Sequence, residues 1–280
     1  MAETCEVCFR HCQLREGQIG FCGARSCTDG AIKAASYGRL TSLALDPIEK
    51  KPLRHFHPGS LILSAGSYGC NLRCPFCQNS EISWSKQALQ MADMDIRYFA
   101  PAEIARLASS YRDHGNIGVA YTYNEPLVGY EYVRDCARLV HEQGMVNVLV
   151  SNGTASLKVL DELLPYIDAM NIDLKGFNDH YYNEVLGGSR QMTMEFIEHA
   201  AGKCHLELTT LIVPGENDSR EEMRQMCNWI AELDPQIPLH ISRFFPRFQM
   251  KDRPATDVKL IYELSDIARE KLSYVYTGNC

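Results

Sequence analysis

Long apolar runs are missing from this 280-residue sequence, and none approaches the length that spans a bilayer. The chain begins without a basic region followed by an apolar stretch, which is the pattern of a secretory signal. Positive charge is not in excess, because the formal net charge is −7. We therefore expect a cytoplasmic protein that binds neither nucleic acid nor an anionic membrane surface.

Cysteine, by contrast, is abundant, with 12 residues in a chain that is 45% apolar and 22% charged. Such a composition allows a sizeable core. In a reducing compartment, many cysteines indicate metal ligation or redox chemistry more than disulfides. Three of them lie in apolar stretches and are interpreted as core residues: Cys136, Cys204 and Cys227.

The first 60 residues differ in texture from the rest. Residues 1–60 are rich in cysteine, glycine and charge, and we predict a separate N-terminal region there. It should contain a hairpin in which 31–37 returns as 40–45 around Gly38. Its short basic run, from Lys50 to His57, is interpreted as a solvated loop.

Residues 61–280 alternate short apolar runs with amphipathic helices. Pro101 should open one helix, Ser219 should cap another, and the last should span about 256–272. Repeated β–α units imply a parallel sheet with its active site at the carboxyl ends of the strands. The pattern fits either an open doubly wound sheet or an incomplete barrel. Six strands are predicted: 61–65, 117–121, 146–150, 169–174, 206–213 and 239–244.

Three cysteines, here called the central cysteines, follow the first of these strands: Cys70, Cys74 and Cys77. Disulfides among them would close small, strained loops. Three thiolates can instead hold a four-iron cluster, which normally takes four, and so leave one iron with an open position. Gly66 and Gly69 suit a loop wrapped around such a cluster. A zinc knot with a fourth ligand elsewhere is the alternative.

This spacing, with Phe76 before the third cysteine, resembles the radical S-adenosylmethionine (SAM) superfamily. Six further stretches resemble its subgroup of pyruvate formate-lyase activating enzymes, and in particular the AmmeMemoRadiSam-system branch: 47–53, 121–126, 150–153, 171–175, 211–218 and 240–244. The resemblance implies a partial (β/α)6 barrel with a [4Fe-4S] cluster on the central cysteines. It also implies cleavage of SAM to a 5′-deoxyadenosyl radical, which abstracts hydrogen from a substrate.

By the same resemblance, seven residues would bind SAM: Phe76, Asn124, Glu125, Ser151, Asn152, Asp173 and Lys175. Glu125 would accept from the amino group, and Lys175 would pair with the carboxylate. Structural alternatives exist for each, including a helix-end role for Glu125, a turn role for Asn152 and a plain Asp173–Lys175 ion pair. Lys175 could also form a Schiff base in an aldolase-type barrel. Activating enzymes often have an acidic residue where Val150 stands, so a cation site is not assigned.

Two functions follow from the resemblance. One is activation of a glycyl-radical enzyme, and the other is the same radical chemistry on a different, AmmeMemoRadiSam-type substrate. Both need an electron donor such as flavodoxin or ferredoxin, and the first needs a protein substrate. We expect a monomer. A non-catalytic metal-binding protein or an aldolase is disfavoured by the central cysteines together with the charged pair at the barrel mouth.

Four further cysteines, here called the N-terminal cysteines, have the close spacing of a metal knuckle: Cys5, Cys8, Cys12 and Cys22. Four thiolates suit zinc or an auxiliary iron–sulfur cluster alike. Large apolar residues are few in this region, so a metal would explain its order. We expect a structural role rather than electron relay, because no further cysteine-rich insertion covers the site. Cys27 is a spare or alternative ligand.

Overall fold

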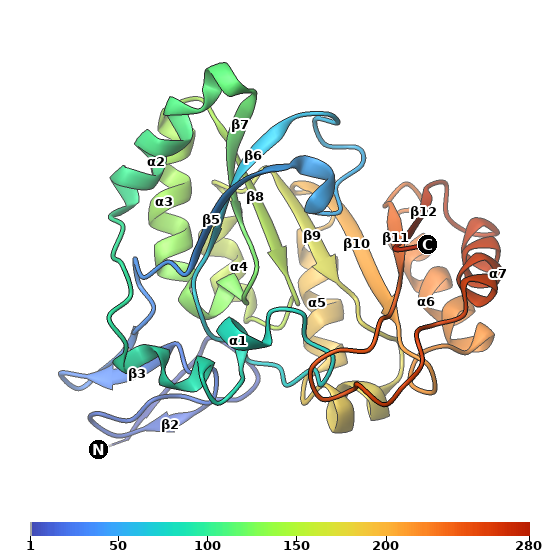
Figure 1. Ribbon diagram of the computed structural model, residues 1–280, viewed down its shortest axis with the longest axis horizontal. Helices are drawn as coiled ribbons and strands as arrows, with labels where there is room; N and C mark the ends of the chain where they lie inside the picture. The colour runs from blue at the N-terminus through green and yellow to red at the C-terminus, as the bar shows by residue number, and fades with distance from the viewer. Residues whose placement is uncertain (1) are drawn as a thin grey trace.

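The computed structural model describes residues 2–280, and its centre is an eight-stranded sheet. The strands lie in the order β12-β11-β10-β9-β8-β7-β6-β5 (Figure 1), and every neighbouring pair is parallel except β5–β6. Their bounds are Ser42–Pro47 (β5), Leu61–Gly66 (β6), Asn116–Tyr121 (β7), Val146–Ser151 (β8), Ala169–Asp173 (β9), His205–Ile212 (β10), Leu239–Arg243 (β11) and Val275–Gly278 (β12). The predicted α/β fold with a partial barrel is confirmed, and so are the six predicted strands.

Helices connect the parallel strands and cover the outer face of the sheet (Figure 1). Pro101 occupies the first turn of α2, and the Ser219 hydroxyl accepts the amide N–H of Glu222 at the start of α6, as predicted. The last helix is shorter than expected: it begins after its N-cap, Asp257, and ends at Arg269. Their bounds are Ser80–Ser83 (α1), Pro101–Ser110 (α2), Tyr130–Glu142 (α3), Leu157–Leu163 (α4), Arg190–Ala200 (α5), Arg220–Leu233 (α6) and Val258–Arg269 (α7).

Alternate residues of the strands face two separate apolar layers. Outward-facing residues such as Leu63 and Val119 pack with the helices in the main core, which also buries Cys136 and Cys227. Inward-facing residues, among them Ile62 and Val148, pack inside the barrel against Ile48 and Leu53. The segment after β5 therefore closes the barrel at its amino end and leaves the carboxyl end free for a site.

Two predictions in the first 60 residues are wrong. Residues 31–34 form β4 (Ala31–Ala34), which pairs with the preceding β3 (Arg25–Thr28) across Asp29-Gly30, and not with a strand after Gly38. Both turn residues have positive φ, 55° and 68°, which suits the tight hairpin turn that Asp-Gly favours. The basic run is not wholly solvated either, because Lys51 is buried and pairs with Asp46 at 2.8 Å.

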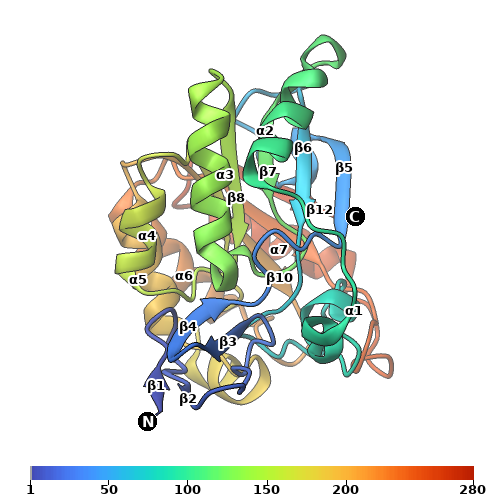
Figure 2. The ribbon, with the colours of Figure 1, turned by 90° about the vertical axis from the view of Figure 1, so that its left-hand side faces the viewer.

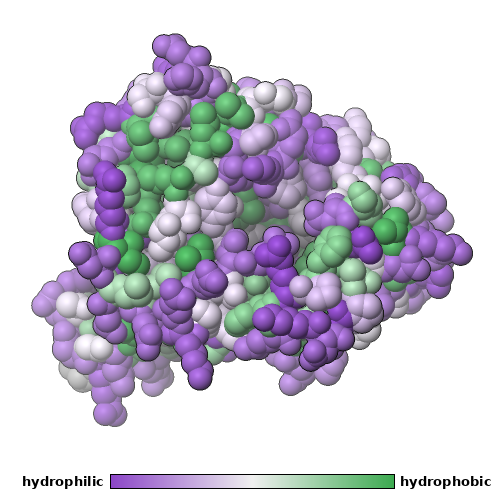
Figure 3. All heavy atoms as spheres, in the orientation of Figure 1, coloured by the Kyte–Doolittle hydropathy of each residue, from purple (hydrophilic) through white to green (hydrophobic). Residues whose placement is uncertain are grey.

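The remaining N-terminal strands are short: β1 (Glu3–Thr4) pairs with β2 (Gln13–Leu14). Figure 2 shows β1–β4 together at the end of the molecule toward which the parallel strands run. β5 lies within residues 1–60 and yet belongs to the main sheet. The predicted division into residues 1–60 and 61–280 therefore stays a prediction. Within residues 2–280, no helix combines the length and apolar character needed to cross a membrane. The face in Figure 3 is mostly hydrophilic, with an apolar area in its upper left part, where Figure 1 shows α2 and the strands beside it.

Candidate active site

A cavity of about 310 Å³ opens at the carboxyl ends of the strands. All three central cysteines line it, together with the seven residues predicted to bind a cofactor. Those seven come from the cysteine loop and from the ends of β7, β8 and β9. Parallel strands thus bring together side chains that are far apart in the sequence, such as Phe76 and Lys175. This agrees with the expectation that the site lies at the carboxyl ends of the strands.

The central cysteines lie on the loop between β6 and α1. The amide N–H of Cys77 donates to the carbonyl of Cys74, which closes a tight turn, and the N–H of Leu72 lies 3.4 Å from the Cys70 sulfur. Burial raises the pKa of the Cys74 thiol to about 12 and that of Cys70 well above its ordinary value. These two thiols are therefore protonated at neutral pH.

The Asn124 side chain holds the cysteine loop by hydrogen bonds to the backbone of that loop. Its side-chain oxygen accepts the N–H of Ser67 at 2.9 Å, and its amide nitrogen donates to the carbonyls of Tyr68 and Gly69 at 3.0 and 3.2 Å. An amide with both ends engaged has little capacity left for a ligand. The structure thus places Asn124 in the cavity wall, where it positions the cysteine loop.

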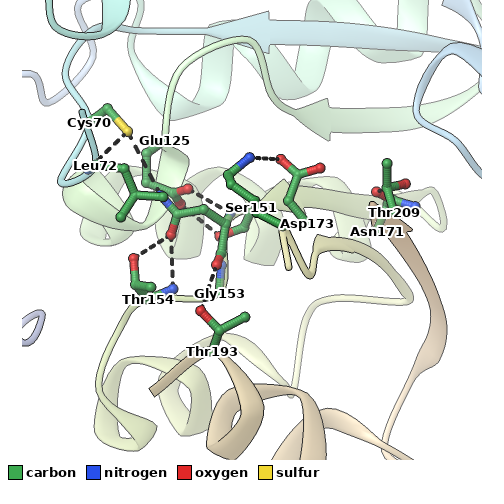
Figure 4. A network of polar contacts seen from close by, with 12 residues as sticks. Cys70, Leu72, Glu125, Ser151, Gly153, Thr154, Asn171, Asp173, Thr193 and Thr209 are labelled. Carbon is green, nitrogen blue, oxygen red and sulfur yellow. Dashed lines mark hydrogen bonds and ion pairs between the residues drawn. The ribbon is translucent and has the colours of Figure 1, made fainter. Parts of the chain in front are cut away.

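Glu125, only 3% exposed, joins the ends of β7 and β8 (Figure 4). It accepts from the Ser151 hydroxyl and the Asn152 N–H, each at 2.8 Å, and caps the following turn by accepting from the Leu127 N–H at 3.0 Å. Burial raises the pKa of Glu125 to about 7 despite these bonds. A carboxylate has about four acceptor positions, so one remains for a ligand.

Asn152 has the turn role that the sequence left open. Its oxygen accepts the Thr154 N–H at 2.9 Å, and its nitrogen donates to the Asn71 side chain at 2.9 Å. The same nitrogen lies 3.8 Å from the Cys70 sulfur. Asn152 therefore ties the end of β8 to the cysteine loop, and a contact with the Cys70 sulfur is one of its interactions.

Asp173 and Lys175 form an ion pair of 2.8 Å at the end of β9 (Figure 4). Burial lowers the pKa of Lys175, but the Asp173 carboxylate outweighs burial and raises it overall. An amine held protonated in this way is a poor nucleophile for Schiff-base formation, which argues against the hypothesis of an aldolase. A lysine with three donors and this single partner can still bind an anion.

Sequence reasoning missed several residues that line the same cavity, including Thr209 and Leu211 on β10 and Ser242 on β11. Thr209 donates to the Asn171 side chain at 2.9 Å. A signal for them was present, because Glu207, Thr209 and Leu211 alternate along one strand and must share its inner face. The N-terminal cysteines line a different cavity, beside this one.

Comparison with known proteins identifies the family of this chain. The model of the radical SAM superfamily matches residues 65–229, which is more than half of the chain. This chain belongs to the radical SAM superfamily. The cavity fits the family's cofactors, since it offers three thiols for a [4Fe-4S] cluster and both charges for an amino acid group.

Among relatives of this radical SAM protein, one from Methanocaldococcus jannaschii, itself described as uncharacterized, is 38% identical over 98% of this chain and 80% of its own length. The pyruvate formate-lyase 1-activating enzyme of Escherichia coli K12 is 27% identical over 59% of this chain and 66% of the enzyme. The chain is therefore related to the activating enzymes. The AmmeMemoRadiSam branch stays a prediction.

Solved structures show the same fold at low sequence identity. Streptococcus suis SuiB bound to S-adenosylmethionine matches with a TM-score of 0.59 at 14% identity, covering 76% of this radical SAM protein and 48% of SuiB. A domain of a pyruvate-formate lyase-activating enzyme from Bacteroides vulgatus has a TM-score of 0.51 at 16% identity, covering 58% of this chain and 99% of that domain.

Proposed function

We propose that the protein binds a [4Fe-4S] cluster on the central cysteines and SAM beside it, and abstracts hydrogen from a substrate. When bound, these groups supply one-electron cleavage of SAM to a 5′-deoxyadenosyl radical. The observation that carries the proposal is a single cavity lined by three thiols and by two groups of opposite charge, the buried Glu125 and the partly buried Lys175, whose side chain is 16% exposed.

The protein's own residues orient the cofactor. The free acceptor position of Glu125 suits the ammonium of SAM, and Lys175 suits its carboxylate, so the two ends of the amino acid group would be fixed from β7 and β9. Asp173, which is more exposed than Lys175, would face the ribose or a cation. Asn124 and Asn152 hold the cysteine loop from both sides.

We propose a protein glycine as the target, because several relatives are named as activating enzymes, of pyruvate formate-lyase and of indoleacetate decarboxylase. A specific observation favours a second target class. The likeness to the E. coli activating enzyme extends over 59% of this chain, whereas the M. jannaschii relative matches 98% of it. The same radical chemistry on another substrate, of AmmeMemoRadiSam type, is therefore the second candidate.

The chemistry is tested by anaerobic reconstitution with iron and sulfide, followed by reduction with dithionite in the presence of SAM. We expect 5′-deoxyadenosine and methionine as products, and an electron paramagnetic resonance (EPR) signal that shifts on adding SAM. Cys74→Ala should abolish these products and the SAM-induced shift of the EPR signal. Cys204→Ala, in which the altered cysteine lies outside the cavity, should keep both. Intact SAM after prolonged reduction of the iron-loaded protein would refute the proposal.

A further inference from the structure

The N-terminal cysteines converge on one cavity although they span 18 residues. Cys5, Cys8 and Cys22 are buried and Cys12 is half-buried, and all four line the cavity. The Cys5 N–H donates to the Cys12 carbonyl at 2.9 Å, which brings these two together. Cys27 does not line the cavity; it lies on β3 opposite Ile32. The set of thiols that share one space is therefore four.

Two guanidinium groups line the same cavity. Arg25 is 5% exposed and donates from its two terminal nitrogens to Glu131, at 2.9 and 2.7 Å, while its buried Nε has no hydrogen-bond partner within residues 2–280. The Arg10 guanidinium lies over the Phe21 ring, 3.5 Å from its centre, and lines the cavity with the four cysteines. An unpaired buried N–H beside four thiols indicates a missing anionic acceptor. Thiolates and sulfide would provide it.

The spacing of the thiols favours a cluster over a single ion. Tetrahedral zinc draws its sulfur ligands to about 2.3 Å from one point. Nowhere in residues 2–280 do three His, Cys, Asp or Glu side chains meet closely enough to hold one ion. The central cysteines of this radical SAM chain likewise form no such single-ion group. Four thiols around a cavity, rather than around a point, suit a group of several iron and sulfide ions.

The cavity directly adjoins the central cysteines. The Cys70 N–H donates to the Cys22 carbonyl at 3.1 Å, so the two cysteine loops share a peptide hydrogen bond. Asn71, the neighbour of Cys70, accepts from Arg10 through its carbonyl at 3.3 Å and lines the same cavity as Cys8. No cysteine-rich insertion is needed to cover the site, because Arg10, Phe21 and Asn71 line it instead.

We propose that the N-terminal cysteines hold a second iron–sulfur cluster that relays electrons to the cluster on the central cysteines. One electron enters from an external low-potential donor of the ferredoxin or flavodoxin class, and one leaves across the Cys22–Cys70 contact. No bond forms or breaks, and no proton moves. This role replaces the structural knot expected from the sequence.

The decisive experiment is metal analysis of a variant in which all three central cysteines are alanine, reconstituted anaerobically with ferrous iron and sulfide, with zinc also present. We expect iron and acid-labile sulfide in equal amounts, and an EPR signal on reduction. Zinc without sulfide, or no metal in a protein that circular dichroism shows to be folded, would overturn the proposal. If that variant does not fold, the wild type decides, because its iron content should be about twice that of a variant lacking the N-terminal cysteines.

Two further measurements test whether the two clusters are neighbours and whether electrons pass from one to the other. In the fully reduced wild type, two neighbouring paramagnetic clusters should broaden each other's EPR signals, whereas each variant should give an unbroadened signal. Reduced flavodoxin should reduce the central cluster at least tenfold more slowly when the N-terminal cysteines are alanine. Cys27→Ala, buried but outside the cavity, is the matched control and should behave as the wild type. A wild-type spectrum equal to the sum of the two variants, or an unchanged reduction rate, would refute the relay.

Discussion

At the scale of single residues, the capacity of each side chain to bind a ligand depends on how many hydrogen bonds it already makes within the protein. Glu125 shares its oxygens among three donors and so holds the loops after β7 and β8 as much as it could bind a ligand. Lys175 has the single partner Asp173. The lysine therefore has the larger unused capacity, and its loss should affect the cofactor more than the protein.

Lys175→Ala should weaken SAM binding roughly ten- to a hundredfold, because a charge-assisted hydrogen bond contributes about 1.5–3 kcal/mol. The iron content should not change, since Lys175 is no cluster ligand. Equilibrium binding of SAM to the reconstituted variant measures the effect, with Lys158→Ala, on the exposed face of α4, as the control. An affinity equal to that of the wild type would show that Lys175 does not bind the cofactor.

Residue identities at the site were largely predictable, but their contacts were not. The seven predicted residues all line the cavity, because each is the last residue of a parallel strand or lies on the loop that follows one. The sequence could not show that the Asn124 amide faces the backbone of residues 67–69. Thr209 was missed since it lies within a strand and not in the loop after it.

At the scale of elements, apolar runs predicted the strands well and their partners less well. The six predicted strands are buried on both faces, whereas β12 is short and half-exposed and gives a weak signal. The run at 42–47 is a strand, but it pairs with β6 rather than with 31–37. Asp29-Gly30 was the stronger turn signal, because both residues tolerate positive φ.

Glu207 links three elements at the closed end of the barrel. It lies on β10 and accepts from His205 and from His240 of β11, at 2.9 and 2.6 Å, and from the N–H groups of Arg54 and His55. Burial alone would raise the pKa of Glu207, but these bonds lower it from 4.5 to about 2. The carboxylate thus stabilises the fold above pH 4.5, and this contribution is lost as pH falls toward 2.

Glu207→Gln should therefore lower the free energy of unfolding at neutral pH by on the order of 3 kcal/mol. The difference from the wild type should shrink between pH 4.5 and 2, where the wild-type carboxylate itself becomes protonated. Urea unfolding across this pH range measures it, with Glu195→Gln on the exposed face of α5 as control. A difference that stays constant with pH would contradict the role given to the ionised Glu207.

At Gly69, the loop of the central cysteines is in close contact with the N-terminal region. Its φ is +92°, and a Cβ there would lie 2.6 Å from the Ala24 Cβ and 2.7 Å from the Cys22 carbonyl. Gly202 also has positive φ, +74°, but a Cβ there would meet nothing within 4 Å. The two glycines thus separate backbone strain from steric overlap.

We expect Gly202→Ala to cost about 1–2 kcal/mol of unfolding free energy through its backbone alone. Gly69→Ala should cost about 1–3 kcal/mol more, because two backbone segments must move apart. It should also lower the iron bound after reconstitution, which Gly202→Ala should leave unchanged. Denaturant titration and iron analysis of both variants check this, and equal losses in the two would show that the contact at Gly69 is unimportant.

At the scale of the whole molecule, the barrel does not close. The sheet ends in β5 on one side and β12 on the other, and these two strands do not pair. The cavity is bounded by the cysteine loop and by the strand ends of this incomplete barrel. An incomplete barrel of this kind can admit a polypeptide loop, which a closed barrel packed with side chains would exclude.

A polypeptide target makes a prediction about the transferred atom. If the target is a glycine of a glycyl-radical enzyme from the same organism, supplying that enzyme with glycine deuterated at Cα should place one deuterium in the released 5′-deoxyadenosine. The glycine should then show a doublet EPR signal, and oxygen should cleave the backbone there. Mass spectrometry of the nucleoside gives the first readout, and undeuterated target protein is its control. Deuterium-free 5′-deoxyadenosine from an enzyme that still cleaves SAM would leave the radical chemistry intact and move the target to the second class.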